Sequence, residues 1–301
     1  MANSLKGNVL KIKDLGKIGI VGPGLLGGSI SLALKSRDIP AKIVGIGHRK
    51  SSLDRAIQIG AIDEASEDLS ALADSQLVII ATPISLIKKT IDSLAAILQP
   101  GAIVTDVGST KRKVCQWGGQ LLKRKIEFVG SHPIAGSEKR GIDFARPDLF
   151  ANANCFITPT PGNSTDAVNL VSELWTLIGM RVIQTSPERH DQLLAAVSHL
   201  PHLVAAGLVN ACSEDQLRFT GTGFLDTTRI ASGDVNLWHD ILVSNSDKIE
   251  SALKKFIGEI DKLRVAIKNK DSKKICEFLA KAKTKRDDLM KFKLEHKQIE
   301  A

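Results

Sequence analysis

His132 has the side chain best placed for acid–base chemistry in this sequence. It lies in GSHPIAGSE, directly after the short apolar run 127–129, which we predict to be a buried strand. Ligands bind at the carboxyl edge of an open α/β sheet, so His132 is expected to face a cleft. An imidazole with an ordinary pKa near ~6.5 accepts a proton at neutral pH. Ser109 follows the neighbouring predicted strand, and we expect it to bond to the His132 ring.

A second group of histidines lies in SHLPH, where His199 and His202 are three residues apart and share one face of a helix. A metal site would need a third ligand, and His190 and Asp191 lie about two turns earlier. We favour a polar cleft wall beside a proline kink and predict no metal site. Further along, Asp226 precedes Arg229 by three residues. It could hold the guanidinium rigid for a carboxylate, although a surface ion pair explains the spacing equally well.

A glycine-rich turn, GPGLLG, follows the first apolar run and precedes a helix-length segment. That context is typical of dinucleotide binding. Gly22 permits a tight turn, Gly24 lets the backbone approach a pyrophosphate, and Gly27 lets the helix pack on the strand. Leu25 and Leu26 begin the helix whose unpaired N–H groups face the phosphates.

The position that contacts the ribose lies ~20 residues beyond the glycines, and sites that prefer NAD have an acidic residue there. This chain has Gly47, followed by His48, Arg49 and Lys50. With no carboxylate to repel a 2′-phosphate and two cations to pair with it, we predict NADP. The alternative is that Arg49 stacks on the adenine and that NAD also binds.

Short apolar runs alternate with helix-length segments in the first part of the chain, without the period-two pattern of half-exposed strands. This predicts a Rossmann-type, doubly wound parallel sheet of the α/β class. From Ser186, an expected helix cap followed by Pro187, the spacing becomes helical. We therefore predict a nucleotide-binding domain over residues 1–185 and an all-helical domain over 186–301. The predicted strands are 17–21, 42–46, 77–81, 103–106, 127–129, 154–158 and 181–184, and the predicted helices are 26–35, 51–59, 84–98, 111–122, 166–178, 187–210, 249–267 and 272–294.

The amino-acid composition excludes some classes of protein function. The chain has 301 residues, 41 Lys and Arg against 33 Asp and Glu, and no tyrosine, which excludes mechanisms that use a tyrosine acid or base. Thirteen basic residues against six acidic ones lie in 262–301, and we interpret this stretch as a solvated helix face rather than a nucleic-acid site.

No apolar run reaches ~18 residues, so no membrane partner is expected. Four separated cysteines favour a reducing cytoplasm.

Several separated motifs resemble those of the prephenate/arogenate dehydrogenase family of tyrosine biosynthesis, from about residue 17 to about 270. They are the glycine-rich turn, DVGSTK, GSHPIAGSEKRG, SHLPH and FLDTTRIASGDVNLWHD. The resemblance implies oxidation of the ring hydroxyl of prephenate, hydride transfer to NAD(P) and loss of carbon dioxide to give 4-hydroxyphenylpyruvate. Arogenate, which would give tyrosine directly, is the alternative substrate.

The resemblance also assigns roles to residues. His132 matches the catalytic histidine bonded to the hydroxyl, and Ser109 matches the serine that positions this histidine and the substrate. Substrate-binding positions are matched by Arg229, which would clamp a carboxylate, by His202 and His199 in the pocket wall, and by Glu138 at the cleft edge. The family's helical domain is a dimerisation surface, so a homodimer is implied.

Two other classes share some of these features. β-Hydroxyacid-type dehydrogenases have the same order of domains, but they rely on a lysine on the helix between domains, and 187–210 contains none. A non-enzymatic nucleotide-sensing module that binds nucleic acid through its basic C-terminal stretch is the third hypothesis.

Overall fold

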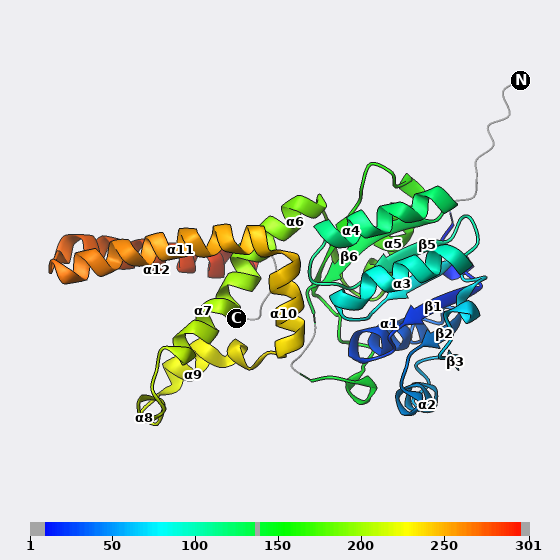
Figure 1. Cartoon of the computed structure of the whole chain (residues 1–301), viewed down its shortest axis with the longest axis horizontal. Helices are drawn as coiled ribbons and strands as arrows, with labels where there is room; N and C mark the ends of the chain where they lie inside the picture. Colours follow the sequence, from blue (N-terminus) through cyan, green and yellow to red (C-terminus); the bar gives the residue numbers. More distant parts are fainter. Residues whose placement is uncertain (1–9, 136–138, 296–301) are drawn as a thin grey trace, which may run out of the picture.

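The computed structural model describes residues 10–135 and 139–295. One part of the molecule is a sheet with helices on both faces, and the other part is entirely helical (Figure 1). The predicted fold class is confirmed.

Eight strands form one sheet in the order β3-β2-β1-β4-β5-β6-β7-β8. The chain order reverses between β1 and β4, which is the switch point where dinucleotides bind in such folds. A short edge strand, β3, escaped prediction. The strands are β1 (Lys17–Val21), β2 (Lys42–Ile46), β3 (Glu64–Ser66), β4 (Leu77–Ile80), β5 (Ile103–Asp106), β6 (Glu127–Pro133), β7 (Asn154–Thr158) and β8 (Arg181–Gln184).

The sheet is parallel except where β7 pairs antiparallel with β6. The prediction of a wholly parallel sheet is wrong at this one pairing. A parallel neighbour needs a crossover, usually a helix. Among the described residues, only the 3₁₀ turn Ile142–Phe144 lies between β6 and β7, so the chain returns in the opposite direction.

Burial on both faces explains the uninterrupted apolar runs. In β4, Leu77 and Ile79 belong to one buried cluster, and Val78 and Ile80 belong to the other. Helices α1, α2 and α5 cover the first face, while α3 and α4 cover the second. These helices are α1 (Leu25–Lys35), α2 (Lys50–Gln58), α3 (Ile84–Ile97), α4 (Arg112–Gly118), which continues as a 3₁₀ helix (Gly119–Arg124), and α5 (Thr165–Leu177).

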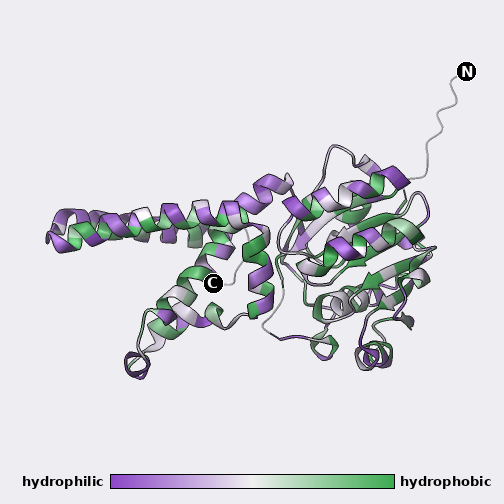
Figure 2. Ribbon diagram, viewed as in Figure 1, coloured by the Kyte–Doolittle hydropathy of each residue, from purple (hydrophilic) through white to green (hydrophobic). Residues whose placement is uncertain are grey.

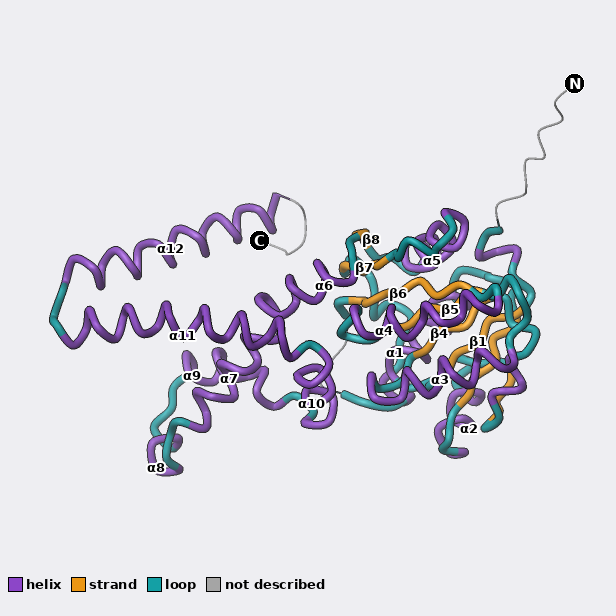
Figure 3. Tube along the Cα trace, turned by 45° about the horizontal axis from the view of Figure 1, so that its top comes forward, coloured by secondary structure: helices purple, strands orange, loops and turns teal. Residues whose placement is uncertain are grey.

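The helical part begins as predicted. Ser186 caps the first helix by accepting a hydrogen bond from Arg189 N at 3.2 Å, with Pro187 in the first turn. The helices are α6 (Pro187–Leu194), α7 (Leu200–Asn210), α8 (Glu214–Leu217), α9 (Thr222–Thr228), α10 (Val235–Ser244), α11 (Ser246–Lys268) and α12 (Ser272–Glu295). The last two form a long hairpin that projects from the molecule (Figure 3).

A π-helical turn, Ala195–His199, joins α6 to α7. We predicted a kink at Pro201, which has no N–H to donate. The chain accommodates Pro201 by forming the wider π-helical turn before it. Such turns occur frequently at functional sites, and this one contains His199.

The stretch Pro187–Asn210 is long and apolar enough to cross a membrane by length and composition, and 28% of its most apolar window is buried. The criterion of ~18 uninterrupted apolar residues missed it. Its polar residues His190, Asp191 and His199 are buried against neighbouring elements of the protein. Figure 2 shows strands that are mostly hydrophobic and helices that alternate between hydrophobic and hydrophilic residues.

Hydrogen bonds tie the helical part to the sheet. The Ser85 N–H, at the start of α3, donates to Asp240 at 3.1 Å. The hydroxyls of Thr110 and Ser244 lie 3.0 Å apart and are buried. These contacts set the helical part over the carboxyl end of the parallel strands.

Candidate active site

The glycine-rich turn has the backbone geometry that a bound dinucleotide requires. Gly22 has a φ of +89°, and a Cβ atom on Gly27 would collide with the carbonyl oxygen of Gly22. A Cβ atom on Gly24 would meet nothing within 4 Å, which leaves room for a pyrophosphate. Helix α1 begins at Leu25, so the N–H groups of Leu25 and Leu26 have no partner within the helix. These residues fit a dinucleotide.

The end of β2 lies beside this turn, because Gly22 N donates to Ile46 O at 2.8 Å. His48, Arg49 and Lys50 follow, and all three are exposed. Arg49 precedes α2 and Lys50 begins it. The three residues therefore lie at the edge of the sheet where the ribose of a bound dinucleotide is expected.

His132 lies within a strand and not in the predicted loop. Strand β6 continues to Pro133 by pairing with β7, which places His132 opposite Phe156. Glycine and proline disfavour strands, so the sequence did not indicate this extension. Because β5 pairs with β6 only as far as Val129, His132 still lies beyond the carboxyl end of β5. It is 9% exposed.

The ring partner of His132 is His190 and not Ser109. The Nδ1 atom of His132 lies 2.9 Å from Nε2 of His190. Ser109 is half-buried after β5, and no hydrogen bond joins it to His132 in the structure described. The predicted Ser109–His132 bond is therefore wrong, because β7 and α6 place His190 against Nδ1. Across residues 10–135 and 139–295, Nε2 of His132 has no hydrogen-bond partner, so it is available to a ligand.

His190 is in turn bonded to Asp191, whose Oδ1 lies 2.8 Å from His190 Nδ1. The Asp191 carboxylate also accepts the backbone N–H groups of Lys111 at 2.7 Å and Arg112 at 3.0 Å. Both His190 and Asp191 are fully buried. His132 of the sheet is thus connected to the first helix of the helical part.

Burial is the main reason why the pKa of His132 lies well below its ordinary value of 6.5, and the nearby charges of His190, Lys111 and His199 lower it further. Lys111 forms a fully buried ion pair with Asp106 at the end of β5. His132 is therefore neutral at neutral pH. A neutral imidazole accepts a proton at Nε2 when its own proton is on Nδ1.

Two histidines of the helical part meet at Trp238. The His202 ring stacks on the indole, with ring centroids 3.5 Å apart and planes 8° apart, and His199 packs edge-on at 6.2 Å. A Cβ atom on Gly233 would collide with the indole, so a glycine is required there. Burial lowers the pKa of His199 to about 4, and Asn245 donates to its Nδ1 at 3.3 Å. Both histidines are buried, at 1% and 7% exposed, so the polar cleft wall stays a prediction.

The structure shows fewer contacts for the remaining predicted substrate-binding residues. Arg229 is exposed and begins a 3₁₀ turn, Arg229–Ser232, at the end of α9. No ion pair joins it to Asp226 in the described part of the chain, so the predicted support for its guanidinium is wrong. The change of helix type at Arg229 removes the regular spacing that the prediction assumed. Glu138 lies outside the described residues.

Several residues of this site were not among the predicted site residues. His190 and Asp191 were considered only as metal ligands, and Asp106, Lys111 and Trp238 lay inside recognised motifs without a role of their own. The signal that could have identified them was the presence of charged residues, Asp and Lys, in or next to segments predicted to be buried. No group of three potential metal ligands converges among residues 10–135 and 139–295, and the absence of a metal stays a prediction.

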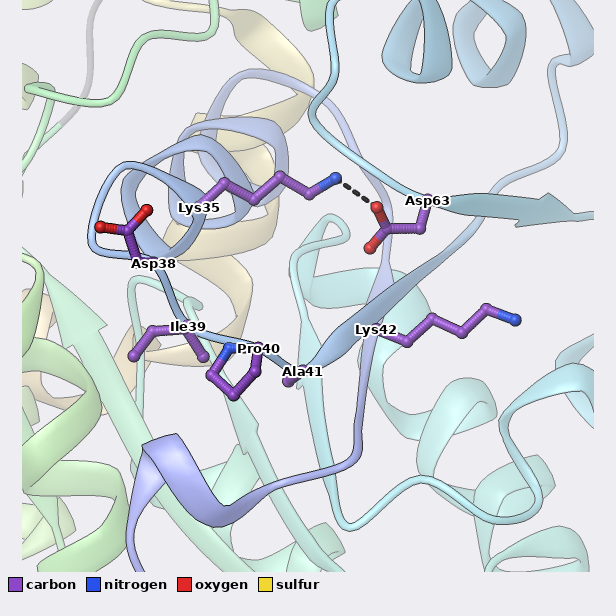
Figure 4. A pocket seen from close by; sticks show the side chains of 7 residues that line it. All are labelled: Lys35, Asp38, Ile39, Pro40, Ala41, Lys42 and Asp63. Carbon is purple, nitrogen blue, oxygen red and sulfur yellow. Dashed lines mark hydrogen bonds and ion pairs between the residues drawn. The ribbon is translucent and has the colours of Figure 1, made fainter.

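A surface hollow of about 570 Å³ lies away from this site, at the amino end of β2 (Figure 4). Its two lysines are already paired, Lys35 with Asp63 at 2.5 Å and Lys42 with Glu64 at 2.6 Å. It therefore does not compete with the glycine-rich turn as the dinucleotide site.

The fold and this site define a two-domain dehydrogenase that uses a nicotinamide dinucleotide. The family described as "Prephenate dehydrogenase, nucleotide-binding domain" matches residues 30–184, and "Prephenate dehydrogenase, dimerization domain" matches residues 186–281. The chain belongs to the prephenate dehydrogenase family and is an NAD(P)-dependent oxidoreductase with a small-molecule substrate. This membership contradicts the β-hydroxyacid dehydrogenase and non-enzymatic hypotheses.

Individual relatives agree. The chain is 38% identical to prephenate dehydrogenase of Bacillus subtilis over 90% of its own length and 75% of the relative. The structure of prephenate dehydrogenase from A. aeolicus in complex with hydroxyphenyl propionate and NAD+ is similar, with a TM-score of 0.86 and 31% identity over 94% of this chain and 100% of that one. Synechocystis arogenate dehydrogenase has a TM-score of 0.80 and 32% identity over 91% and 99% of the two chains.

The glycine-rich turn yields a matched pair of variants. Gly27→Ala should destabilise the protein by about 1–3 kcal/mol, because its Cβ meets backbone that cannot move aside. Gly24→Ala should leave stability unchanged and still weaken dinucleotide binding, since its Cβ occupies the space left for the pyrophosphate. Chemical denaturation and cofactor titration distinguish the two effects. Equal stability of the two variants would contradict the assigned packing.

The lowered pKa of His199 predicts how stability depends on pH. In the unfolded chain a histidine takes up a proton below pH ~6.5, whereas folded His199 does so only near pH 4. Protons therefore favour the unfolded state, and this contribution is complete above pH ~6.5 and lost as the pH falls toward 4. It amounts to ~3 kcal/mol. His199→Asn should reduce the slope of unfolding free energy against pH, whereas His239→Asn, on the exposed face of α10, controls for the loss of one histidine.

Proposed function

We propose that the protein oxidises and decarboxylates prephenate to 4-hydroxyphenylpyruvate, with His132 as the proton acceptor. The observation that supports this most directly is the buried, neutral His132 with a free Nε2, beyond the carboxyl end of β5. The sequence motifs and the similarity to prephenate dehydrogenases supply the substrate class.

In this reaction the residues of the chain orient the substrate and accept and return one proton. A bound nicotinamide would supply the acceptor for the hydride that leaves the carbon bearing the ring hydroxyl. His132 Nε2 accepts the hydroxyl proton as the C=O bond forms. The ring carboxylate then leaves as carbon dioxide, and its bonding electrons make the ring aromatic. The phenolate oxygen takes the proton back from His132, so the protein is regenerated.

Substrate binding is assigned to the helical wall and the adjacent loops. Arg229 is exposed and has no ion pair in the described ranges, so its guanidinium is available to a substrate carboxylate. His202 and His199 pack against Trp238 in the same helical part, and we assign them to the wall of the substrate pocket. We keep Ser109 as a residue that positions the substrate, and we keep Glu138, which lies outside the described residues, as a substrate-binding candidate.

Arogenate is the second candidate substrate, and the similarity to Synechocystis arogenate dehydrogenase favours keeping it. The two substrates differ by a keto group or an amino group on the side chain. Assays of both, each with NAD and NADP, decide between them. Turnover of neither would refute the proposed function.

For the cofactor we propose a preference for NADP. Gly47 supplies no acidic side chain, and Arg49 and Lys50 are exposed beside the end of β2. Guanidinium and ammonium groups pair with a 2′-phosphate, whereas NAD offers only hydroxyls there.

We also propose a domain boundary after residue 185, a homodimer formed through the helical part, and a cytoplasmic location. The family matches end at 184 and resume at 186. Large apolar side chains are exposed on the helices, including Val197 at 71% and Val235 at 79%, and a second copy would cover them. Four free cysteines fit a reducing compartment.

His132→Asn and Arg229→Ala should affect different kinetic constants. Loss of the base should lower kcat by ~10²–10⁴-fold with little change in KM. Loss of the guanidinium should chiefly raise KM for the substrate, by about tenfold or more, because it removes a charge-assisted bond. Steady-state kinetics measure both. Near-normal turnover of His132→Asn would overturn the assignment.

Arg49→Ala should raise KM for NADP by about tenfold and leave KM for NAD nearly unchanged. Arg189→Ala is the matched control, because it removes an exposed arginine on α6, away from β2. An equal loss of affinity for both cofactors would indicate that Arg49 stacks on the adenine and does not read the phosphate.

A further inference from the structure

Three buried side chains connect the catalytic strand to the helical part in a single hydrogen-bonded series. His132 Nδ1 lies 2.9 Å from His190 Nε2, and His190 Nδ1 lies 2.8 Å from Asp191 Oδ1. The series ends at the amino terminus of α4, where the backbone N–H groups of Lys111 and Arg112 donate to the Asp191 carboxylate. His190 and Asp191 are both fully buried, so solvent does not reach the hydrogen bond between them.

The hydrogen atoms in this series can have only one arrangement when both histidines are neutral. An ionised carboxylate only accepts hydrogen bonds, so His190 must carry its proton on Nδ1. The Nε2 atom of His190 is then an acceptor, and the bond to His132 requires a proton on His132 Nδ1. The Nε2 atom of His132 is consequently left with a lone pair.

The charge states support this order. Burial opposes ionisation of Asp191, yet the bonds from His190, Lys111 and Arg112 keep its pKa below the ordinary value. Burial lowers the pKa of His190, and Asp191 only partly opposes this. Lys111 and His199 also face the two histidines, and Lys111 is neutralised by Asp106.

We propose that His190 and Asp191 are positioning residues that fix His132 in the tautomer whose Nε2 can accept the substrate proton. This inference rests on the proposed role of His132 as the base. It also couples chemistry to the seating of the domains, because His190 and Asp191 belong to α6 whereas His132 and the amides that hold Asp191 belong to the sheet domain.

Asp191→Asn tests the carboxylate. An amide can donate as well as accept, so it no longer dictates which nitrogen of His190 carries the proton. We expect kcat to fall by about tenfold or more, as happens when a catalytic histidine adopts the wrong tautomer, with KM for substrate and cofactor changed far less. Nitrogen NMR of histidine-labelled protein should show Nε2 of His132 unprotonated in the parent and partly protonated in the variant.

Asp240→Asn is the matched control. Asp240 also accepts a backbone N–H across the domain boundary, from Ser85, but it is not connected to His132. It should retain kcat and the parent tautomer. A fall in kcat for Asp191→Asn without a tautomer change, or an equal fall in Asp240→Asn, would show a structural role only and overturn the proposal.

A second pair of variants keeps the test independent of the folding of Asp191→Asn. His190→Gln retains an acceptor oxygen near the position of Nε2, whereas His190→Leu has none. We expect His190→Gln to keep the His132 tautomer and more activity than His190→Leu. Equal activity and equal spectra would overturn the inference. If His132→Asn is itself fully active, the proposed function fails first, so the two failures are distinguishable.

Discussion

The structure depends on the buried Asp191 carboxylate, which is held by two backbone N–H groups at the start of α4. Taking a carboxylate out of water costs several kcal/mol unless hydrogen bonds compensate for the lost hydration. His190, on the same helix, supplies part of that compensation, and the Lys111 and Arg112 amides supply the rest only when the helical part is seated on the sheet. One interaction therefore joins the two parts and holds His190 against the ring of His132, the proposed base.

The hydrophobic core around the site offsets the cost of burying these charged side chains. The strands are buried on both faces, so apolar burial from two layers of helices stabilises the domain that supplies Asp106, Lys111 and His132. Strand β6 extends past β5 because it pairs with β7, and the extension brings His132 under α6. The antiparallel pairing is thus not an incidental departure from the parallel fold. It places His132, the proposed base, where His190 of the helical part contacts it.

The site is divided between two domains with different tasks. The sheet domain provides a rigid turn for a dinucleotide and the base, while the helical domain provides histidines stacked on Trp238 and an exposed Arg229. A reaction driven by aromatisation needs little more than orientation and one proton acceptor. Rigid elements, rather than long loops, hold most of these groups, which suits a reaction in which geometry supplies much of the rate.

Local patterns in the sequence determined all strands except β3 and the extension of β6, most of the longer helices, the glycine-rich turn and the choice of His132 as the candidate base, because each depends on neighbours within a few residues. Tertiary structure alone decided that β7 runs antiparallel, that His190 and not Ser109 meets the His132 ring, and that Asp226 does not pair with Arg229. These outcomes depend on residues up to 58 positions apart in the chain, as His132 and His190 are. Spacing along the sequence has no information about such contacts, since burial and hydrogen-bond compensation are settled only when the domains pack.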